Sequence, residues 1–236
     1  MNWKDLETSP LMFDINALEQ TGKRIICGVD ECGRGSWAGP IVAGCAVFTT
    51  IKDVFWQQFA QRVRDSKQLS AEARYELANE IRQRAFIATS YLSNTMIENI
   101  GLEKSNTLVL EDAIITALTK AYGGKQPDYS EVLILVNGKH ISMLNDKNDR
   151  IEYVCFPKAD AKSFTVAAAS IIGKAERDSY MIEQDSIYPQ YKFAAHKGYG
   201  TPEHKRLLNI LGPCAIHRRT FKPIQEAINR RKKKKR

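Results

Sequence analysis

The sequence predicts an α/β fold in which a mixed sheet is flanked by helices and followed by a small helical C-terminal segment. Two early apolar runs are joined by a glycine-bearing loop, a pattern that favours an antiparallel pair of strands. Helical stretches then alternate with further apolar runs, which favours a sheet covered by helices. The 236 residues, 43% hydrophobic and 26% charged, are enough for one sizeable core. They exclude a collagen, a disulfide miniprotein and a wholly disordered chain.

The strands are predicted from apolar runs. The first, residues 24–30, is a buried run that ends in an acid, and the second is the run at 41–48. The turn between them carries Gly33, Gly35 and Gly39. Further strands are predicted at 85–93, 131–136 and 151–156. The run at 131–136, EVLILV, is apolar almost throughout, as expected of a strand covered on both faces.

Helical periodicity and capping signals predict the helices. Residues 71–84 place Ala, Leu and Ile on one face and follow Ser70, a favoured N-cap residue. The other helices are predicted at 95–100, 104–121, 163–182 and about 202–211. The sequence has neither the ~18 consecutive apolar residues of a membrane span nor a secretory signal, so we expect a cytoplasmic protein.

Positive charge is concentrated at one end of the chain. Lys and Arg total 35 against 27 Asp and Glu, and residues 230–236 are all basic, so the rest carries 35 − 7 − 27 = +1. Because like charges repel and nothing apolar can pack there, we expect 230–236 to be a disordered tail. Such a tail could attract phosphates, act as a nuclear-import signal or affect only solubility. Composition does not separate these roles.

Cysteine and histidine offer no recognisable zinc or thiol site. The five cysteines form no CxxC pair, and the four histidines form no HExxH motif. Most of the cysteines lie in apolar runs, which is typical of small core residues in a reducing compartment.

Asp30 and Glu31 are the strongest local feature, because they end a predicted strand directly before a Gly-Arg-Gly turn. Adjacent carboxylates are costly unless a cation neutralises them, so the pair indicates a magnesium-type site of oxygen ligands. Asp160, which follows the last predicted strand, could add another ligand. On local pattern alone the commoner explanations stay open: two solvated acids in a turn and, for Asp160, an acid stabilised by a helix dipole.

Five blocks of sequence, in order over residues 25–221, resemble ribonuclease HII. They are GVDECGRGSWAGPIVAGCAV, DSKQLS, KADAKSFTVAAASIIGKAERD, HKGYGTPEH and HRRTF. Five ordered blocks are far more specific than any one of them, and the chain is identified as a member of this family, of the single-chain bacterial kind. The resemblance implies an N-terminal segment at 1–23, a ribonuclease H-like catalytic domain at 24–182 and a C-terminal helical and loop segment at 183–229 that completes the substrate site.

The resemblance also implies a role for each matching residue. Asp30, Glu31 and Asp160 match metal-binding carboxylates of the family. The turn of Gly33, Arg34 and Gly35 matches a loop whose backbone contacts the ribose 2′-hydroxyl, the group that distinguishes RNA from DNA. The remaining matches are Tyr199, which would stack near the sugar of an RNA–DNA junction, and three residues that would contact the nucleic-acid backbone, Asp65, Ser66 and Lys67.

One position departs from the family pattern. Where the family has an Asp that supplies the remaining carboxylate, this chain has Asn137. Asn offers a carbonyl oxygen but no negative charge, so we expect weaker metal occupancy and a large loss of rate. The residue could be natural or an engineered substitution. Asp146 and Asp149 could replace it, although their positions argue against this. Cys32 stands where the family commonly has alanine, a change we expect to be harmless.

The activity implied by the resemblance is hydrolysis of RNA in RNA–DNA hybrids and at single ribonucleotides in duplex DNA, as in ribonucleotide excision repair. Cleavage 5′ of the ribonucleotide would leave a 3′-hydroxyl and a 5′-phosphate. Asp30, Glu31, Asn137 and Asp160 would hold two Mg²⁺ or Mn²⁺ ions roughly 3.5–4 Å apart, and the protein would act as a monomer. Two alternatives stay open: a catalytically weak RNA–DNA junction-binding module of the same fold, and a basic structural protein that binds nucleic acid through its tail.

Overall fold

The computed structural model describes residues 9–64, 70–138 and 153–234. Within them a five-stranded sheet has the order β3-β2-β1-β4-β5. β2 is antiparallel to both β1 and β3, whereas β4 is parallel to both β1 and β5. The strands are β1 (Ile25–Cys32), β2 (Ile41–Phe48), β3 (Phe86–Leu92), β4 (Val132–Asn137) and β5 (Tyr153–Phe156). The predicted antiparallel pair and the predicted mixed sheet are both confirmed.

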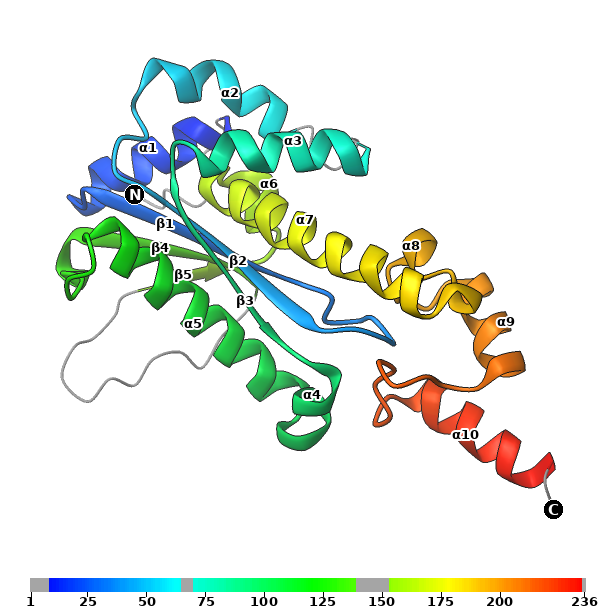
Figure 1. Cartoon of the computed structure of the whole chain (residues 1–236). Coiled ribbons are helices and arrows are strands. Elements are labelled where there is room, and N and C mark those ends of the chain that lie inside the picture. Colours follow the sequence, from blue (N-terminus) through cyan, green and yellow to red (C-terminus); the bar gives the residue numbers. More distant parts are fainter. Residues whose placement is uncertain (1–8, 65–69, 139–152, 235–236) are drawn as a thin grey trace.

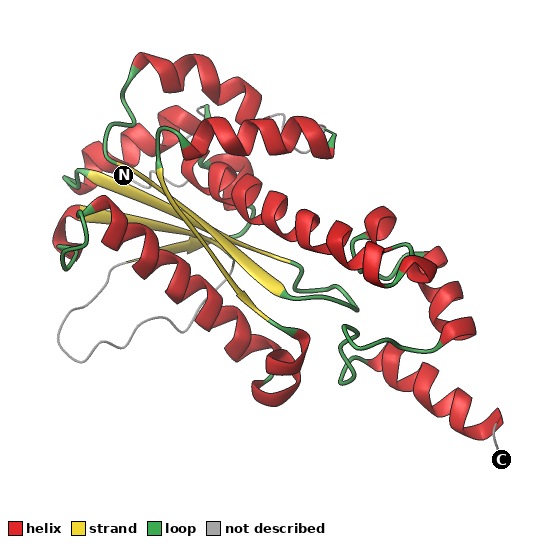
Figure 2. Cartoon of the chain, viewed as in Figure 1, coloured by secondary structure: helices red, strands yellow, loops and turns green. Residues whose placement is uncertain are grey.

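Helices cover both faces of the sheet (Figure 1). One face is covered by α1 (Pro10–Thr21), α2 (Val54–Arg64), α3 (Ala71–Arg82), α6 (Ala159–Lys162) and α7 (Phe164–Ile187). The other is covered by α4 (Asn94–Ile100) and α5 (Leu102–Ala121). A short turn, η3 (Tyr129–Glu131), precedes β4. Figure 2 shows the C-terminal segment as short helices beyond the end of α7; they are η4 (Pro189–Tyr191), α8 (Phe193–His196), α9 (Pro202–Leu211) and α10 (Lys222–Lys234).

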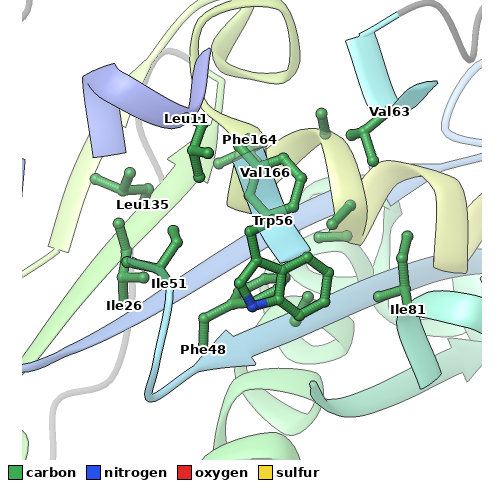
Figure 3. Packing of buried hydrophobic residues seen from close by; sticks show 14 of the residues in the cluster. Leu11, Ile26, Phe48, Ile51, Trp56, Val63, Ile81, Leu135, Phe164 and Val166 are labelled. Atoms are coloured by element: carbon green, nitrogen blue, oxygen red, sulfur yellow. The ribbon is translucent and has the colours of Figure 1, made fainter. Parts of the chain in front are cut away.

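The core has one layer on each side of the sheet. On the α7 side the layer is partly aromatic (Figure 3), with the Trp56 ring centroid 4.9 Å from that of Phe48 and 5.5 Å from that of Phe164. On the α5 side it is mainly aliphatic and includes Val29 and Ile134. Burial on both faces explains why the central strands are apolar almost throughout.

The helix α7 approaches the sheet backbone at two glycines. A Cβ added to Gly28 in β1 would lie 2.3 Å from the carbonyl carbon of Thr165. One added to Gly44 in β2 would lie 2.2 Å from the carbonyl oxygen of Ala169 and 2.5 Å from the amide nitrogen of Gly173. Only glycine allows two backbones to come this close. These contacts fix α7 against the strand that carries Asp30.

The structure differs from the sequence predictions at several places outside the sheet. The helices α1 and α2 were not predicted, although Ser9 and Pro10 form a favourable start for α1. Helix α7 continues to Ile187, so the division expected after residue 182 falls inside a helix. Residues 230–234, expected to be disordered, extend α10, which packs through Ile224 and Ala227. Lys and Arg are good helix formers once such an anchor supplies the nucleus.

Replacing Gly44 by alanine should lower the free energy of unfolding by about 1–3 kcal/mol, because the added Cβ meets backbone atoms that cannot move aside. Urea or thermal unfolding would measure this. The control is Gly35→Ala, since a Cβ there meets open space and should change stability by less than about 0.5 kcal/mol. Equal losses in both variants would contradict the close approach of α7.

Candidate active site

The candidate site lies where three parallel strands end. Asp30 is near the carboxyl end of β1, Asn137 is the last residue of β4, and Asp160 lies in α6, which follows β5. Because these strands are neighbours and run parallel, their carboxyl ends meet at one edge of the sheet. That edge is where ligand sites of α/β sheets form.

Asp30 is buried in the centre of this group, with 5% of its surface exposed. Its pKa is raised to about 7, chiefly by burial and further by the negative charges of Glu31 and Asp160. Hydrogen bonds with Asn137 and with Ser170 of α7 oppose the rise. Ser170 was not among the predicted site residues, since a serine in an Ala-rich helix gives no local signal.

Asn137 connects the three strand ends. Its Nδ2 donates a 2.8 Å hydrogen bond to Oδ1 of Asp30, and its Oδ1 accepts a 3.0 Å bond from the backbone N–H of Ala159. The amide thus directs a donor at a carboxylate. A carboxylate at position 137 would instead place one of its oxygens about 2.8 Å from Oδ1 of Asp30. Two carboxylate oxygens at this distance need a proton or a cation between them.

Glu31 has different neighbours from Asp30. Successive strand residues point to opposite faces, and the Glu31 carboxylate lies 3.9 Å from the guanidinium of Arg34. Arg34 also pairs with Glu103 of α5, an acid that no motif in the sequence singles out. The pKa of Glu31 is raised, with burial the largest cause and Arg34 opposing it.

The turn after β1 lies beside Tyr199, which comes from the C-terminal segment. Gly33 has φ +84°, a left-handed conformation that favours glycine, and Gly35 is exposed. The Tyr199 side chain lies close enough to the Cys32 side chain and the Gly33 backbone for both to influence its pKa, which burial raises. The backbone N–H of Trp37 donates a 2.8 Å bond to the carbonyl of Gly198. The turn and the tyrosine, far apart in sequence, are therefore joined directly.

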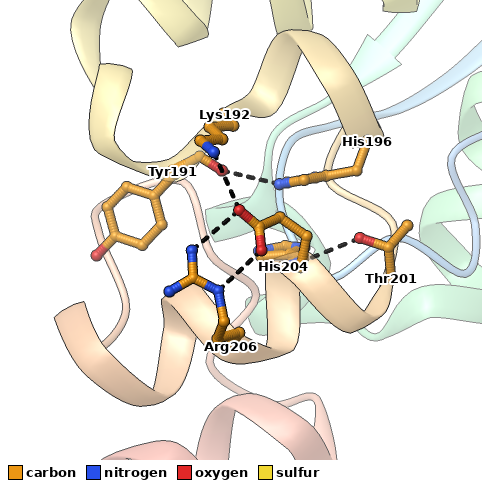
Figure 4. A network of polar contacts seen from close by, with 7 residues as sticks. Tyr191, Lys192, His196, Thr201, His204 and Arg206 are labelled. Atoms are coloured by element: carbon orange, nitrogen blue, oxygen red, sulfur yellow. Dashed lines mark hydrogen bonds and ion pairs between the residues drawn. The ribbon is translucent and has the colours of Figure 1, made fainter.

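Buried histidines lie behind Tyr199, and Figure 4 shows one of them, His204, beside its stacked neighbour His196. The backbone N–H of Cys214 donates to Nδ1 of His217 at 3.0 Å, so His217 carries its proton on Nε2 and donates it to Nε2 of His204 at 3.1 Å. His204 then donates from Nδ1 to the Tyr199 carbonyl at 2.9 Å. Burial lowers the pKa of His204 to about 4 and of His217 to about 3, so both stay neutral near pH 7.

Several predicted positions lie outside the described residues. These are the proposed backbone-contacting residues Asp65, Ser66 and Lys67, and the alternative ligands Asp146 and Asp149. The roles of the described site residues stay predictions. The geometry nevertheless brings Asp30, Asn137 and Asp160 together, and places the Gly33–Gly35 turn next to Tyr199.

Comparison with known sequences decides the family. The sequence profile of ribonuclease HII matches residues 27–224. The chain belongs to the ribonuclease HII family. The ribonucleases HII of Thermus thermophilus and Acholeplasma laidlawii are 39% and 37% identical to it over 204 and 215 residues. These matches cover 86% and 90% of this chain, and 89% and 94% of those proteins.

Members of the ribonuclease HII family are metal-dependent endonucleases that act on RNA–DNA hybrids. Solved structures agree with the fold. Ribonuclease H2 of Pyrococcus horikoshii has a TM-score of 0.68 at 24% identity, covering 89% of this chain and 99% of that one. The Mn²⁺ complex of Bst-RNase HIII also has a TM-score of 0.68, at 21% identity over 92% of this chain and 73% of that one.

The family depends on a divalent metal, and the side chains at the strand ends fit one by their chemistry. Across the described residues, no three His, Cys, Asp or Glu side chains already converge as a metal cage. Glu31 and Asp160 nevertheless bring negative charges close enough to Asp30 to add to the rise in its pKa. Asn137 adds an amide oxygen. Such oxygen donors suit Mg²⁺ or Mn²⁺.

Binding of Mg²⁺ or Mn²⁺ should weaken as the pH falls below about 7. The pKa of Asp30 is raised to about 7, and a metal needs the carboxylate, so below that pH a proton must leave first. Apparent affinity should drop up to about tenfold per pH unit below 7. Calorimetric titrations at pH 6 and pH 8, each in two buffers of different ionisation enthalpy, would measure affinity and proton release.

The matched variant for this titration is Asp30→Asn, which should bind metal weakly at both pH values and release no proton. Wild-type affinity that is the same at pH 6 and pH 8 would contradict the raised pKa of Asp30 as the controlling group.

Proposed function

We propose that this chain is an endoribonuclease that hydrolyses RNA in RNA–DNA hybrids and at single ribonucleotides embedded in duplex DNA. Cleavage would fall on the 5′ side of the ribonucleotide, leaving a 3′-hydroxyl and a 5′-phosphate, as in ribonucleotide excision repair. The observation that carries the proposal is the meeting of Asp30, Asn137 and Asp160 at one sheet edge, in a chain whose family match covers residues 27–224.

Asp30, Glu31, Asn137 and Asp160 are the residues that would hold the metal. Two Mg²⁺ or Mn²⁺ ions bound there would lower the pKa of the attacking water and stabilise the leaving oxygen. The Gly33–Gly35 turn would present its backbone to the ribose 2′-hydroxyl. A side chain at Gly33 would meet the Arg177 guanidinium at 2.1 Å, so only glycine fits at this position of the turn.

Asn137 would weaken this activity for a structural reason. Its amide already satisfies Asp30 through the 2.8 Å hydrogen bond, which is the interaction that a cation would otherwise supply. Its oxygen accepts the Ala159 N–H, which leaves one of its two lone pairs for a metal. The amide therefore lowers the attraction of the site for a metal and adds no charge to offset a second ion.

The Asn137→Asp variant should cleave faster than the wild-type chain in magnesium, by about tenfold or more, because it restores a carboxylate ligand. The measurement is cleavage of duplex DNA that contains one ribonucleotide, with all-DNA duplex as the control. The variant should also gain more thermal stability from Mg²⁺ than the wild type, since its paired carboxylates need a cation.

The outcomes of this assay separate the candidate functions. Cleavage by the variant alone would mean that the wild-type chain is a disabled nuclease. Similar rates for both would mean that Asn137 suffices as a ligand and that its hydrogen bonds do not weaken the site. Specific binding without cleavage by either protein would favour a junction-binding module of the same fold.

The basic end of the chain should contribute affinity without selectivity. Replacing the five basic residues at 232–236 by glutamine should weaken duplex binding several-fold at low salt and reduce the salt dependence of the binding constant. Arg231 is left unchanged, because its side chain packs against Gly212. The preference for ribonucleotide-containing duplex should persist, and Lys125→Gln is the control for loss of an exposed charge.

Loss of that preference together with affinity would instead favour a structural protein that binds through its tail. The monomeric state and the cytoplasmic location stay predictions. Among the helices within the described residues, none has the length and apolar character that crossing a membrane requires.

A further inference from the structure

Two arginines are fully buried behind the Gly33–Gly35 turn. Arg177 of α7 and Arg218, which precedes α10, both have 0% of their surface exposed. Burial of a guanidinium is costly unless its donors are satisfied. Burial, together with the nearby charge of Arg177, lowers the pKa of Arg218 to about 9. Because two buried cations repel each other, hydrogen bonds are needed to keep both guanidinium groups in place.

Arg177 satisfies its donors with the backbone and side chains around this turn. Its Nε donates to the Pro40 carbonyl at 3.1 Å, and its Nη2 donates to the Ser36 hydroxyl at 2.8 Å and to the Ala38 carbonyl at 3.2 Å. The guanidinium also fills the space under Gly33, where an added Cβ would lie 2.1 Å from Nε. The fork of Arg177 therefore determines the path of residues 33–40.

The same guanidinium holds the segment that carries Tyr199. Its Nη1 donates to the Lys197 carbonyl at 2.9 Å, and its Cζ lies 5.1 Å from the centre of the Tyr199 ring. That distance suits a cation–π contact, which is worth more in a desolvated site. One buried side chain thus contacts both elements that the proposed function assigns to substrate recognition.

Arg218 holds the turn from the other side. Its Nε donates to the Gly39 carbonyl at 3.0 Å and its Nη1 to the Arg34 carbonyl at 2.9 Å. Its backbone N–H donates to the Trp37 carbonyl at 2.9 Å. Arg218 does not contact Tyr199 through these bonds. Of the two arginines, Arg177 is the one that bridges the turn and the tyrosine.

We propose that Arg177 is a positioning residue that fixes the Gly33–Gly35 turn and the Tyr199 ring relative to each other, and thereby sets the preference for an RNA–DNA junction. This inference rests on the proposed function, in which the turn contacts the 2′-hydroxyl and Tyr199 stacks at the junction. A lysine at 177 would keep the charge but lose the planar fork that reaches four acceptors.

The test compares two substrates with each protein preparation, in the Asn137→Asp background. One is duplex DNA with a single ribonucleotide, which contains the junction; the other is a continuous RNA–DNA hybrid, which does not. Arg177→Met and Arg177→Lys should lower kcat/KM for the junction substrate at least fivefold more than for the hybrid. A ratio measured on one preparation is independent of the fraction of protein that is folded.

The matched control is Asp178→Asn on the same helix. Asp178 is buried and its ion pairs are with Arg74 of α3 and Lys174 of α7, so its loss removes no ion pair with the turn or with Tyr199 and should leave the substrate ratio unchanged. Arg177→Met combined with Tyr199→Ala should change the ratio little more than Tyr199→Ala alone, because Arg177 acts on the ratio through the tyrosine. If Arg177→Met does not fold, Arg177→Lys decides the test.

An unchanged ratio in folded Arg177→Lys, or full additivity with Tyr199→Ala, would overturn the inference. If the wild-type and Asn137→Asp proteins cleave neither substrate, the proposed function fails, and the positioning role of Arg177 is tested by a binding measurement. In EDTA, the affinity of wild type for ribonucleotide-containing duplex relative to all-DNA duplex should exceed that of Arg177→Lys. Equal preference in the two proteins would then reject the positioning role.

Discussion

The close approach of α7 to the backbones of β1 and β2 is the constraint to which the other features of the structure are tied. Gly28 and Gly44 have no side chains, so the helix backbone lies directly against the two strands. The positions of three elements of the candidate site follow from this placement. The short helix with Asp160 comes immediately before α7, Ser170 reaches Asp30, and Arg177 lies under the turn after β1. One helix thus sets the position of an acid, the environment of a second acid and the shape of the Gly33–Gly35 turn.

The centre of the site illustrates how a hydrogen bond can take the place of an ion. Carboxylates gathered at a sheet edge repel one another, and the pKa of Asp30 is raised chiefly by burial and further by this repulsion. Asn137 relieves part of it by donating to Asp30, which reduces the need for a cation. Carboxylates that repel one another in the absence of a metal bind a cation more strongly, because the cation relieves this repulsion. Under the proposed function, stability of the metal-free site and affinity for the metal would therefore oppose each other at position 137.

Much of the fold was predictable because it depends on local pattern. The buried run EVLILV, the N-cap at Ser70 and the glycine-bearing turn after β1 each carry their signal within a few residues. Helices α1 and α2 were not predicted, and residues 230–234 were expected to be disordered from their charge alone. Their helical state depends on Ile224 and Ala227 earlier in α10, where apolar packing outweighs the repulsion of like charges.

The family and the mixed α/β sheet could be identified without a structure, because they follow from ordered motifs and from periodicity along the chain. The same motifs predict Asp30, Glu31 and Asp160 as metal ligands, and these roles stay predictions. Which of those residues meet, and what holds them, depends on how the chain folds. Arg177 illustrates the difference, since an arginine in a helix looks solvent-exposed in any local pattern. Its burial and its four acceptors come from segments on both sides of it in sequence, at residues 36–40 and 197. Such partners come together only when the chain folds. Hydrogen bonds between distant segments leave no periodic pattern in the sequence, so they could not be predicted from it.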